Sequence, residues 1–149
     1  MTRLRRILDK AVRRPAMAMN RARKGIRKAR GKARSGAHAI ALTRQGKVIL
    51  VRLRYAKGWR LPGGGRSAAE SVIDGALREL AEEIGMTGHG PVRPLPEIDS
   101  SLVLVGGVTY VPARWSWEIE RVIEADLDAL PEGMSPRADR WLRAYRDAR

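Results

Sequence analysis

Residues 64–86 constrain this 149-residue chain more than any other part, because they combine glycines, a helical apolar pattern and a dense acidic group. Ser67 followed by Glu70 is a capping-box pattern, so we expect a helix to begin near Ala68. Gly85 is placed to end that helix as a left-handed cap. Apolar side chains recur at helical spacing between these ends and predict a face that packs on a core: Ile73, Ala76, Leu77, Leu80 and Ile84.

The acidic group of this helix consists of three glutamates at positions i, i+3 and i+4: Glu79, Glu82 and Glu83. At about 100° per residue we expect them together on the side opposite the apolar stripe. Like charges at these spacings repel, and Arg78 alone does not balance three carboxylates, so the group needs a cation. An all-oxygen ligand set suits Mg²⁺, with Mn²⁺ as a second choice, whereas the alternative is a solvated acidic face without a ligand.

The order of fixed residues in this stretch resembles the signature box of the Nudix hydrolase family. Gly64, Glu70 and the run R-E-L-A-E-E-I-G from Arg78 to Gly85 match at every fixed position, and the preceding W-R-L-P-G-G resembles the segment that leads into that box. Over residues 37–145 the resemblance implies an α/β protein of the Nudix type, an α/β/α sandwich with a mixed sheet. It also implies metal-dependent hydrolysis of a diphosphate bond in a nucleoside diphosphate linked to another group.

The resemblance assigns roles to residues of the box by position. Glu79, Glu82 and Glu83 would hold the metal, and the carbonyl of Gly63 would complete its coordination. Glu79 or Glu82 would take the proton of the attacking water, with Arg78 as the residue that orients the cluster. The box specifies the bond and leaves open the attached group, the choice between the two bases and the oligomeric state.

Four residues near the box are predicted to bind the substrate: Arg54, Arg60, Trp59 and Gly64. Arg54 ends a strand predicted over residues 47–54, whose continuous apolar run indicates a central strand buried on both faces. Ordinary edge charge is the alternative for the arginine, and core packing is the alternative for Trp59.

Glu118 and Glu120 are predicted as accessory carboxylates that assist the metal or the water. Residues 115–122 alternate as a strand, which would place both glutamates on one face, and strand-edge charge is the alternative. We also expect a strand over residues 37–43 and a β-type run over 101–111 that Gly106 and Gly107 interrupt as a bulge or hairpin turn. A closing helix is expected from Pro136 to about residue 147, with no chemistry assigned.

Charge divides the chain into a basic N-terminal arm, residues 1–36, and a nearly neutral domain, residues 37–149. The arm carries 14 of the 30 Lys and Arg against Asp9 alone. Residues 3–14 are predicted to form a basic amphipathic helix, and the rest of the arm a solvated helix or a disordered segment. Contact with RNA, docking on an anionic membrane surface and a purely solubilising role stay open for it.

The absence of cysteine and of any long apolar run indicates a soluble, cytoplasmic protein. The expected partner is a small-molecule nucleotide substrate. The alternative function is a nucleotide- or RNA-binding module with a Nudix fold, in which hydrolysis is secondary.

Overall fold

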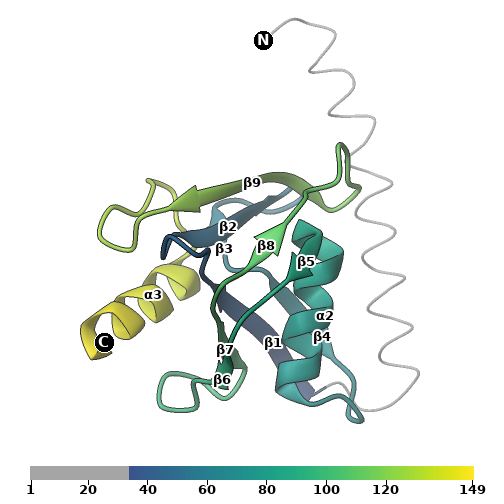
Figure 1. Cartoon of the computed structure of the whole chain (residues 1–149). Coiled ribbons are helices and arrows are strands. Elements are labelled where there is room, and N and C mark those ends of the chain that lie inside the picture. The colour runs from purple at the N-terminus through teal and green to yellow at the C-terminus, as the bar shows by residue number, and fades with distance from the viewer. Residues whose placement is uncertain (1–33) are drawn as a thin grey trace, which may run out of the picture.

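A computed structural model describes residues 34–149, which form nine strands and two helices (Figure 1). The predicted helix over residues 3–14 and most of the basic arm lie outside the described residues. No helix in the described part is long and apolar enough to cross a membrane. In chain order the elements are β1 (Arg34–Ala41), β2 (Val48–Leu53), β3 (Trp59–Arg60), β4 (Gly63–Arg66), α2 (Val72–Ile84), β5 (Met86–Gly88), β6 (Val92–Pro94), β7 (Leu102–Val105), β8 (Thr109–Tyr110), β9 (Ile119–Ala125) and α3 (Pro136–Ala148).

The strands form a four-stranded sheet in the order β4-β1-β7-β6, a three-stranded sheet β3-β2-β9 and a pair β5-β8. β1 and β7 run parallel, with His38 opposite Leu102, and the other pairs are antiparallel. A bridge between Leu42 and Val48 joins the two larger sheets. The pairing is therefore mixed, as predicted.

Two hydrophobic clusters lie on opposite faces of the strands, because alternate residues of β1 and β2 point in opposite directions. One cluster packs under α2 and contains Ala39, Ile49, Val51, Leu80 and Ile84 among its buried residues. The other packs under α3 and contains Ile40, Val48, Leu50, Trp141 and Leu142. The two helices thus cover opposite faces of the strand layer (Figure 1), which confirms the predicted α/β/α sandwich and the buried central strand β2.

Helix α2 begins four residues later than its sequence pattern predicts. Ser71 is the N-cap, with its side chain accepting a hydrogen bond from the backbone N–H of Asp74, whereas residues 67–70 form a turn in which the N–H of Glu70 donates to the carbonyl of Ser67. The predicted capping box is therefore wrong, because the carboxylate of Glu70 binds Arg78 instead. Gly85 ends the helix with φ 71°, the left-handed cap that was predicted.

Two predicted strands are interrupted. Residues 115–118 form a loop, since the hydroxyl of Ser116 accepts hydrogen bonds from the N–H groups of Glu118 and Ile119 and turns the chain before β9 begins. Gly106 and Gly107 form neither a bulge nor a hairpin. They carry the chain from β7 to β8, which pairs with β5 in a different sheet, and Gly107 supplies the positive φ of 57° that the turn requires.

Candidate active site

Glycines let α2 lie unusually close to the strands beneath it. A Cβ at Gly75 would stand 2.9 Å from the Cβ of Ala37 on β1. A Cβ at Gly64 on β4 would stand 2.8 Å from a carboxylate oxygen of Glu79. No side chain larger than hydrogen fits at either position without movement, so the glycine-rich strand β4 forms the floor under the acidic part of the helix.

The three glutamates do not share the solvent side of α2. Glu79 and Glu83 are buried, with 2% and 7% of their surface exposed, whereas the side chain of Glu82 is 39% exposed. The prediction that all three lie opposite the apolar stripe is therefore wrong. Glu79 and Glu83 each precede an apolar stripe residue by one position, so they flank the stripe and face the glycine floor.

Arg78 connects the acidic residues of the site to one another. Its guanidinium donates to both carboxylate oxygens of Glu70, at 2.7 and 3.1 Å, and to Glu79 at 3.0 Å. It also donates to Glu82 at 3.3 Å and to the carbonyl of Gly65 at 3.2 Å. One planar donor group thus fixes the positions of three carboxylates and of the glycine strand, which a lysine ammonium cannot do.

Glu83 carries the strongest electrostatic imbalance in the site. Its carboxylate accepts a hydrogen bond from the N–H of Gly63 at 3.1 Å, which stabilises the ionised form. Burial, and then the neighbouring charges of Glu79 and Glu118, outweigh that bond and raise the pKa of Glu83 well above its usual range. The surroundings of Glu83 therefore disfavour its ionised form when no cation is bound.

A divalent cation fits this imbalance on its donor chemistry. Within residues 34–149 no three His, Asp or Glu side chains converge closely enough to hold an ion among themselves, and Arg78 holds Glu82 to the side. Mg²⁺ commonly uses one or two carboxylates and completes its shell with waters and substrate phosphate oxygens. Glu79 and Glu83 beside the Gly63 backbone match that pattern, although the three-carboxylate convergence expected from the sequence is not present.

The two accessory carboxylates, Glu118 and Glu120, line one cavity together with Glu83, although they do not alternate on one regular strand. Glu118 lies close enough to Glu83 to raise its pKa, and it accepts a hydrogen bond of 3.3 Å from the hydroxyl of Tyr55. Glu120 occupies a register shift, because Arg52 pairs with Arg121 while Leu53 pairs with Ile119. This extra residue breaks the alternation that would have placed both glutamates on one strand face.

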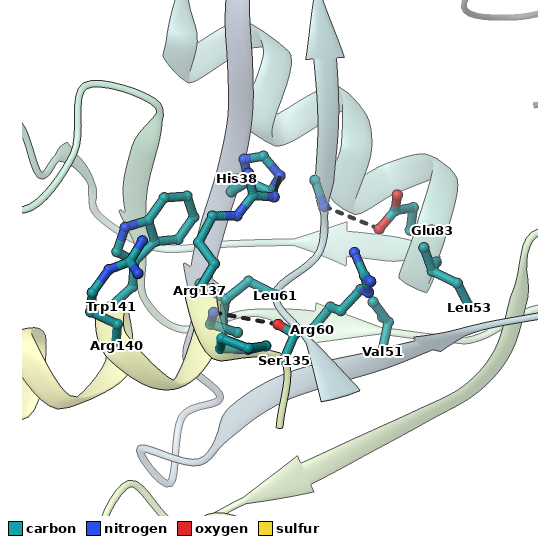
Figure 2. Close-up of a pocket in the computed structure, with 13 residues that line it drawn as sticks. His38, Val51, Leu53, Arg60, Leu61, Glu83, Ser135, Arg137, Arg140 and Trp141 are labelled. Atoms are coloured by element: carbon teal, nitrogen blue, oxygen red, sulfur yellow. Dashed lines mark hydrogen bonds between the residues drawn. The ribbon is translucent and has the colours of Figure 1, made fainter. Parts of the chain in front are cut away.

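A cavity of about 490 Å³ opens beside Glu83 and Gly63, between the strands and the N-terminal end of α3. Figure 2 shows Arg60, Arg137 and Arg140 around this cavity, with the Glu83 carboxylate on the side away from Arg137 and Arg140. Three guanidinium groups in one cavity next to an acidic centre make a site suited to a polyanion. We call it the arginine cavity.

His38 of β1 forms part of the wall of the arginine cavity. Its Nε2 lies 3.0 Å from a guanidinium nitrogen of Arg137, and because an arginine only donates, Nε2 accepts and the ring proton is on Nδ1. That buried Nδ1 has no hydrogen-bond partner among the described residues. Burial, followed by the charge of Arg137, lowers the pKa of His38 to about 4, so the ring is neutral at pH 7.

The four residues predicted to bind the substrate do not lie together in the structure. Arg60 lines the arginine cavity, and Gly64 lies against Glu79. Arg54 points to the other side, where its Nε donates to the carbonyl of Ser116 at 2.6 Å. Trp59 is 6% exposed in the core cluster under α3, which favours the core-packing alternative for this residue.

Comparison with known proteins agrees with this geometry. The family model of the NUDIX domain matches residues 32–144. The chain belongs to the NUDIX family. The predicted family and its class of activity, hydrolysis of a diphosphate bond by an enzyme, are thereby confirmed.

Individual NUDIX proteins are similar to the chain at sequence identities below 30%. It is 29% identical over 119 residues to an RNA pyrophosphohydrolase of Acidiphilium cryptum (strain JF-5), covering 72% of this chain and 73% of that protein. The structure is similar to a MutT NUDIX hydrolase from Burkholderia pseudomallei, with a TM-score of 0.53, 23% identity and coverage of 72% and 94%. It is also similar to a UDP-X diphosphatase, with a TM-score of 0.52 and 18% identity; the match covers 76% of this chain and 63% of that one.

The sequence reasoning missed three residues of this NUDIX domain: His38, Arg137 and Arg140. One signal was available for Arg137, because it lies two residues after the Ser135 N-cap, in the first turn of α3, where the helix dipole disfavours a cation. Nothing in the local sequence points to His38, which reaches the site only through strand pairing.

Proposed function

We propose that this NUDIX protein hydrolyses the diphosphate bond of a nucleotide at the junction of β4, α2 and the arginine cavity. The observation that carries the proposal is the contact between two buried carboxylates, Glu79 and Glu83, and a glycine strand that opens into a cavity with three arginines. The carboxylates suit a metal ion and the neighbouring arginines suit phosphates, so the site matches a metal-bound diphosphate.

The proposed metal ligands are Glu79, Glu83 and the carbonyl of Gly63, with Glu82 as a further candidate. Arg78 binds both Glu79 and Glu82, so each of them would have to turn an oxygen from Arg78 toward the metal. A bound Mg²⁺ or Mn²⁺ would neutralise phosphate charge and lower the pKa of a coordinated water. The raised pKa of Glu83 supports a cation at this position. Arg78 acts as a positioning residue, since its guanidinium donates to carboxylates and to a backbone carbonyl.

The phosphates are proposed to enter the arginine cavity. Arg60, Arg137 and Arg140 supply planar guanidinium donors, and the N–H groups at the start of α3 add further positive potential. His38 supports this wall, because its Nε2 accepts a hydrogen bond from the Arg137 guanidinium and fixes the position of that group. These groups would bind and orient the anion while the acidic side of the cavity holds the metal.

Three carboxylates are candidates for accepting the proton of the attacking water: Glu79, Glu82 and Glu118. Glu79 is buried under Arg78, Glu82 is the most exposed of the box glutamates, and Glu118 adjoins Glu83 from outside the box. Replacing each by glutamine keeps its shape and removes its basicity. The variant whose kcat–pH profile loses its acidic limb identifies the base.

The 5′-phosphorylated end of RNA is the first substrate to test. The name of the Acidiphilium cryptum relative supports this choice, as does the basic composition of residues 1–36, which suits a polyanion bound with counterion release. On this proposal removal of residues 1–31 weakens RNA turnover at physiological salt more than turnover of a mononucleotide.

The deciding experiment is a panel of substrates assayed with Mg²⁺, with Mn²⁺ and with a chelator. The panel contains triphosphorylated RNA, nucleoside triphosphates, ADP-ribose, NADH and a UDP-sugar, and released phosphate, pyrophosphate or mononucleotide is measured. We expect metal-dependent turnover that falls about 10²-fold or more in Glu83→Gln. Tight binding of the panel without turnover by the wild-type chain would instead favour a binding module and refute the proposed hydrolysis.

A further inference from the structure

A second cavity, of about 430 Å³, lies on the other side of Glu83 from the arginine cavity. Its walls are the end of α2 and the loop of residues 111–118 between β8 and β9. Glu82, Glu83 and Glu118 all line it, so it opens directly onto the acidic centre. We call it the tryptophan cavity, because Trp115 and Trp117 project from its loop.

The loop exposes apolar surface that the rest of the described domain covers. Among the described residues, the exposed large hydrophobic side chains are Val111, Trp115 and Trp117, and all three belong to this loop. Trp115 and Trp117 are 45% and 42% exposed and meet edge to face, with ring centroids 4.5 Å apart. Two tryptophans already ordered against each other offer an aromatic surface without stabilising a core.

Positive charge accompanies this aromatic surface. The guanidinium of Arg54 lies 5.2 Å from the ring centroid of Trp115, and its Nε donates to the carbonyl of Ser116 at 2.6 Å, which ties β2 to the loop. Arg114 also lines the cavity. Aromatic faces next to guanidinium groups fit a planar base joined to a phosphate, whereas a lipid chain would gain nothing from the charges.

We propose that the tryptophan cavity holds the nucleobase of the substrate, stacked on Trp115 or Trp117, with Arg54 at the adjoining phosphate. This inference rests on the proposed function, which places the scissile diphosphate at Glu83 between the two cavities. The base then lies on the loop side of the diphosphate, and the remaining phosphates extend into the arginine cavity. A substrate of this class is a nucleotide with further phosphates beyond the scissile bond.

The test measures binding without turnover, using the full chain and α,β-methylene nucleoside triphosphates as probes. Methylenediphosphonate, which carries similar charges and no base, is the matched probe. We expect Trp115→Leu or Trp117→Leu to weaken the nucleotide analogue about tenfold and methylenediphosphonate less than twofold. Trp115→Tyr or Trp117→Tyr restores stacking and most of the affinity. In kinetics, each leucine variant is expected to have a higher KM at nearly constant kcat.

Three results would overturn the inference. The first is an unchanged nucleotide affinity in both leucine variants, and the second is an equal loss of affinity for the nucleotide analogue and for methylenediphosphonate. The third is a loss of self-association of the leucine variants in sedimentation, which would make the loop an interface with a second copy of the chain. The outcome is separable from that of the proposed function. If the wild type hydrolyses its substrate and both leucine variants bind the nucleotide analogue as tightly as the wild type, only the base site is refuted. If the wild type binds nucleotides through the tryptophans but hydrolyses none of them, only the proposed hydrolysis is refuted.

Discussion

The backbone N–H of Gly63 donates a hydrogen bond to the carboxylate of Glu83 at 3.1 Å, and this bond joins strand β4 to helix α2 at the centre of the site. It aims one buried carboxylate oxygen at the glycine strand and leaves the group surrounded by the charges of Glu79 and Glu118. A buried anion among anions destabilises the folded chain unless a cation joins it.

Replacing Glu83 by glutamine is expected to separate activity from stability. The variant keeps the hydrogen bond from Gly63 through its amide oxygen but removes the charge, so metal-dependent kcat falls about 10²-fold or more while the metal-free melting temperature stays equal or rises. Kinetics and thermal denaturation in the presence of chelator measure the two effects. Glu132→Gln, at an exposed loop position, is the control and is expected to change neither.

Replacing Gly64 by alanine tests the close approach of β4 to α2. The added Cβ would stand 2.8 Å from a carboxylate oxygen of Glu79, so that carboxylate has to move. We expect kcat to fall about tenfold or more, in line with the sensitivity of catalysis to displacements near 1 Å. Gly46→Ala provides the contrast, because a Cβ there meets nothing within 4 Å and only the positive φ of 77° is strained. A Gly64→Ala enzyme with normal kcat would contradict the proposed role of Glu79.

Replacing Arg78 by lysine is expected to loosen the whole acidic cluster. A lysine ammonium cannot bind Glu70 through two parallel bonds and still reach Glu79 and Glu82, so we expect a loss of about 1–3 kcal/mol in the free energy of unfolding. A double-mutant cycle with Glu70→Gln measures the coupling. If the effects of the two substitutions on stability simply add, Arg78 is not held by Glu70 in solution.

Replacing Arg137 and Arg140 by alanine tests the arginine cavity. We expect KM to rise about tenfold for each removed guanidinium–phosphate contact, with a smaller change in kcat, and the KM of the wild type to depend more steeply on salt than that of the variants. Arg143→Ala is the matched control on the same helix, because Arg143 is paired with Asp139 and does not line the cavity. Equal effects at all three positions would point to net charge alone.

The lowered pKa of His38 predicts that the folded chain loses stability in acid. Its pKa is lowered from 6.5 to about 4 in the folded chain, so the neutral ring stabilises the fold fully above pH 6.5, and this contribution is lost as pH falls toward 4. The shift corresponds to about 3 kcal/mol at 1.36 kcal/mol per unit. Thermal denaturation of the wild type and His38→Gln between pH 8 and 4 measures it, since carboxylates that do not interact with position 38 contribute equally to both proteins. If the melting temperatures of the two proteins change with pH in the same way, the burial of His38 is contradicted.

Local sequence information was sufficient for the main helices and for strand β2, but not for the start of α2 or for the loop at residues 115–118. The apolar period of α2, its left-handed end at Gly85 and the start of α3 at Pro136 depend on residues a few positions apart, and the structure confirms each of them. The apolar run of β2 likewise predicted a strand buried on both faces. These features follow from backbone geometry and side-chain period, which the chain carries wherever it packs.

Tertiary packing decided which groups meet. The helical period gives the angles between Glu79, Glu82 and Glu83, but only the side-chain-free floor of β4 explains why two of them are buried and one is not. The arginines of α3 and His38 of β1 come together because parallel pairing of β1 with β7 and the packing of α3 bring residues about a hundred positions apart into contact. No local pattern encodes such a contact, because it depends on where whole elements lie.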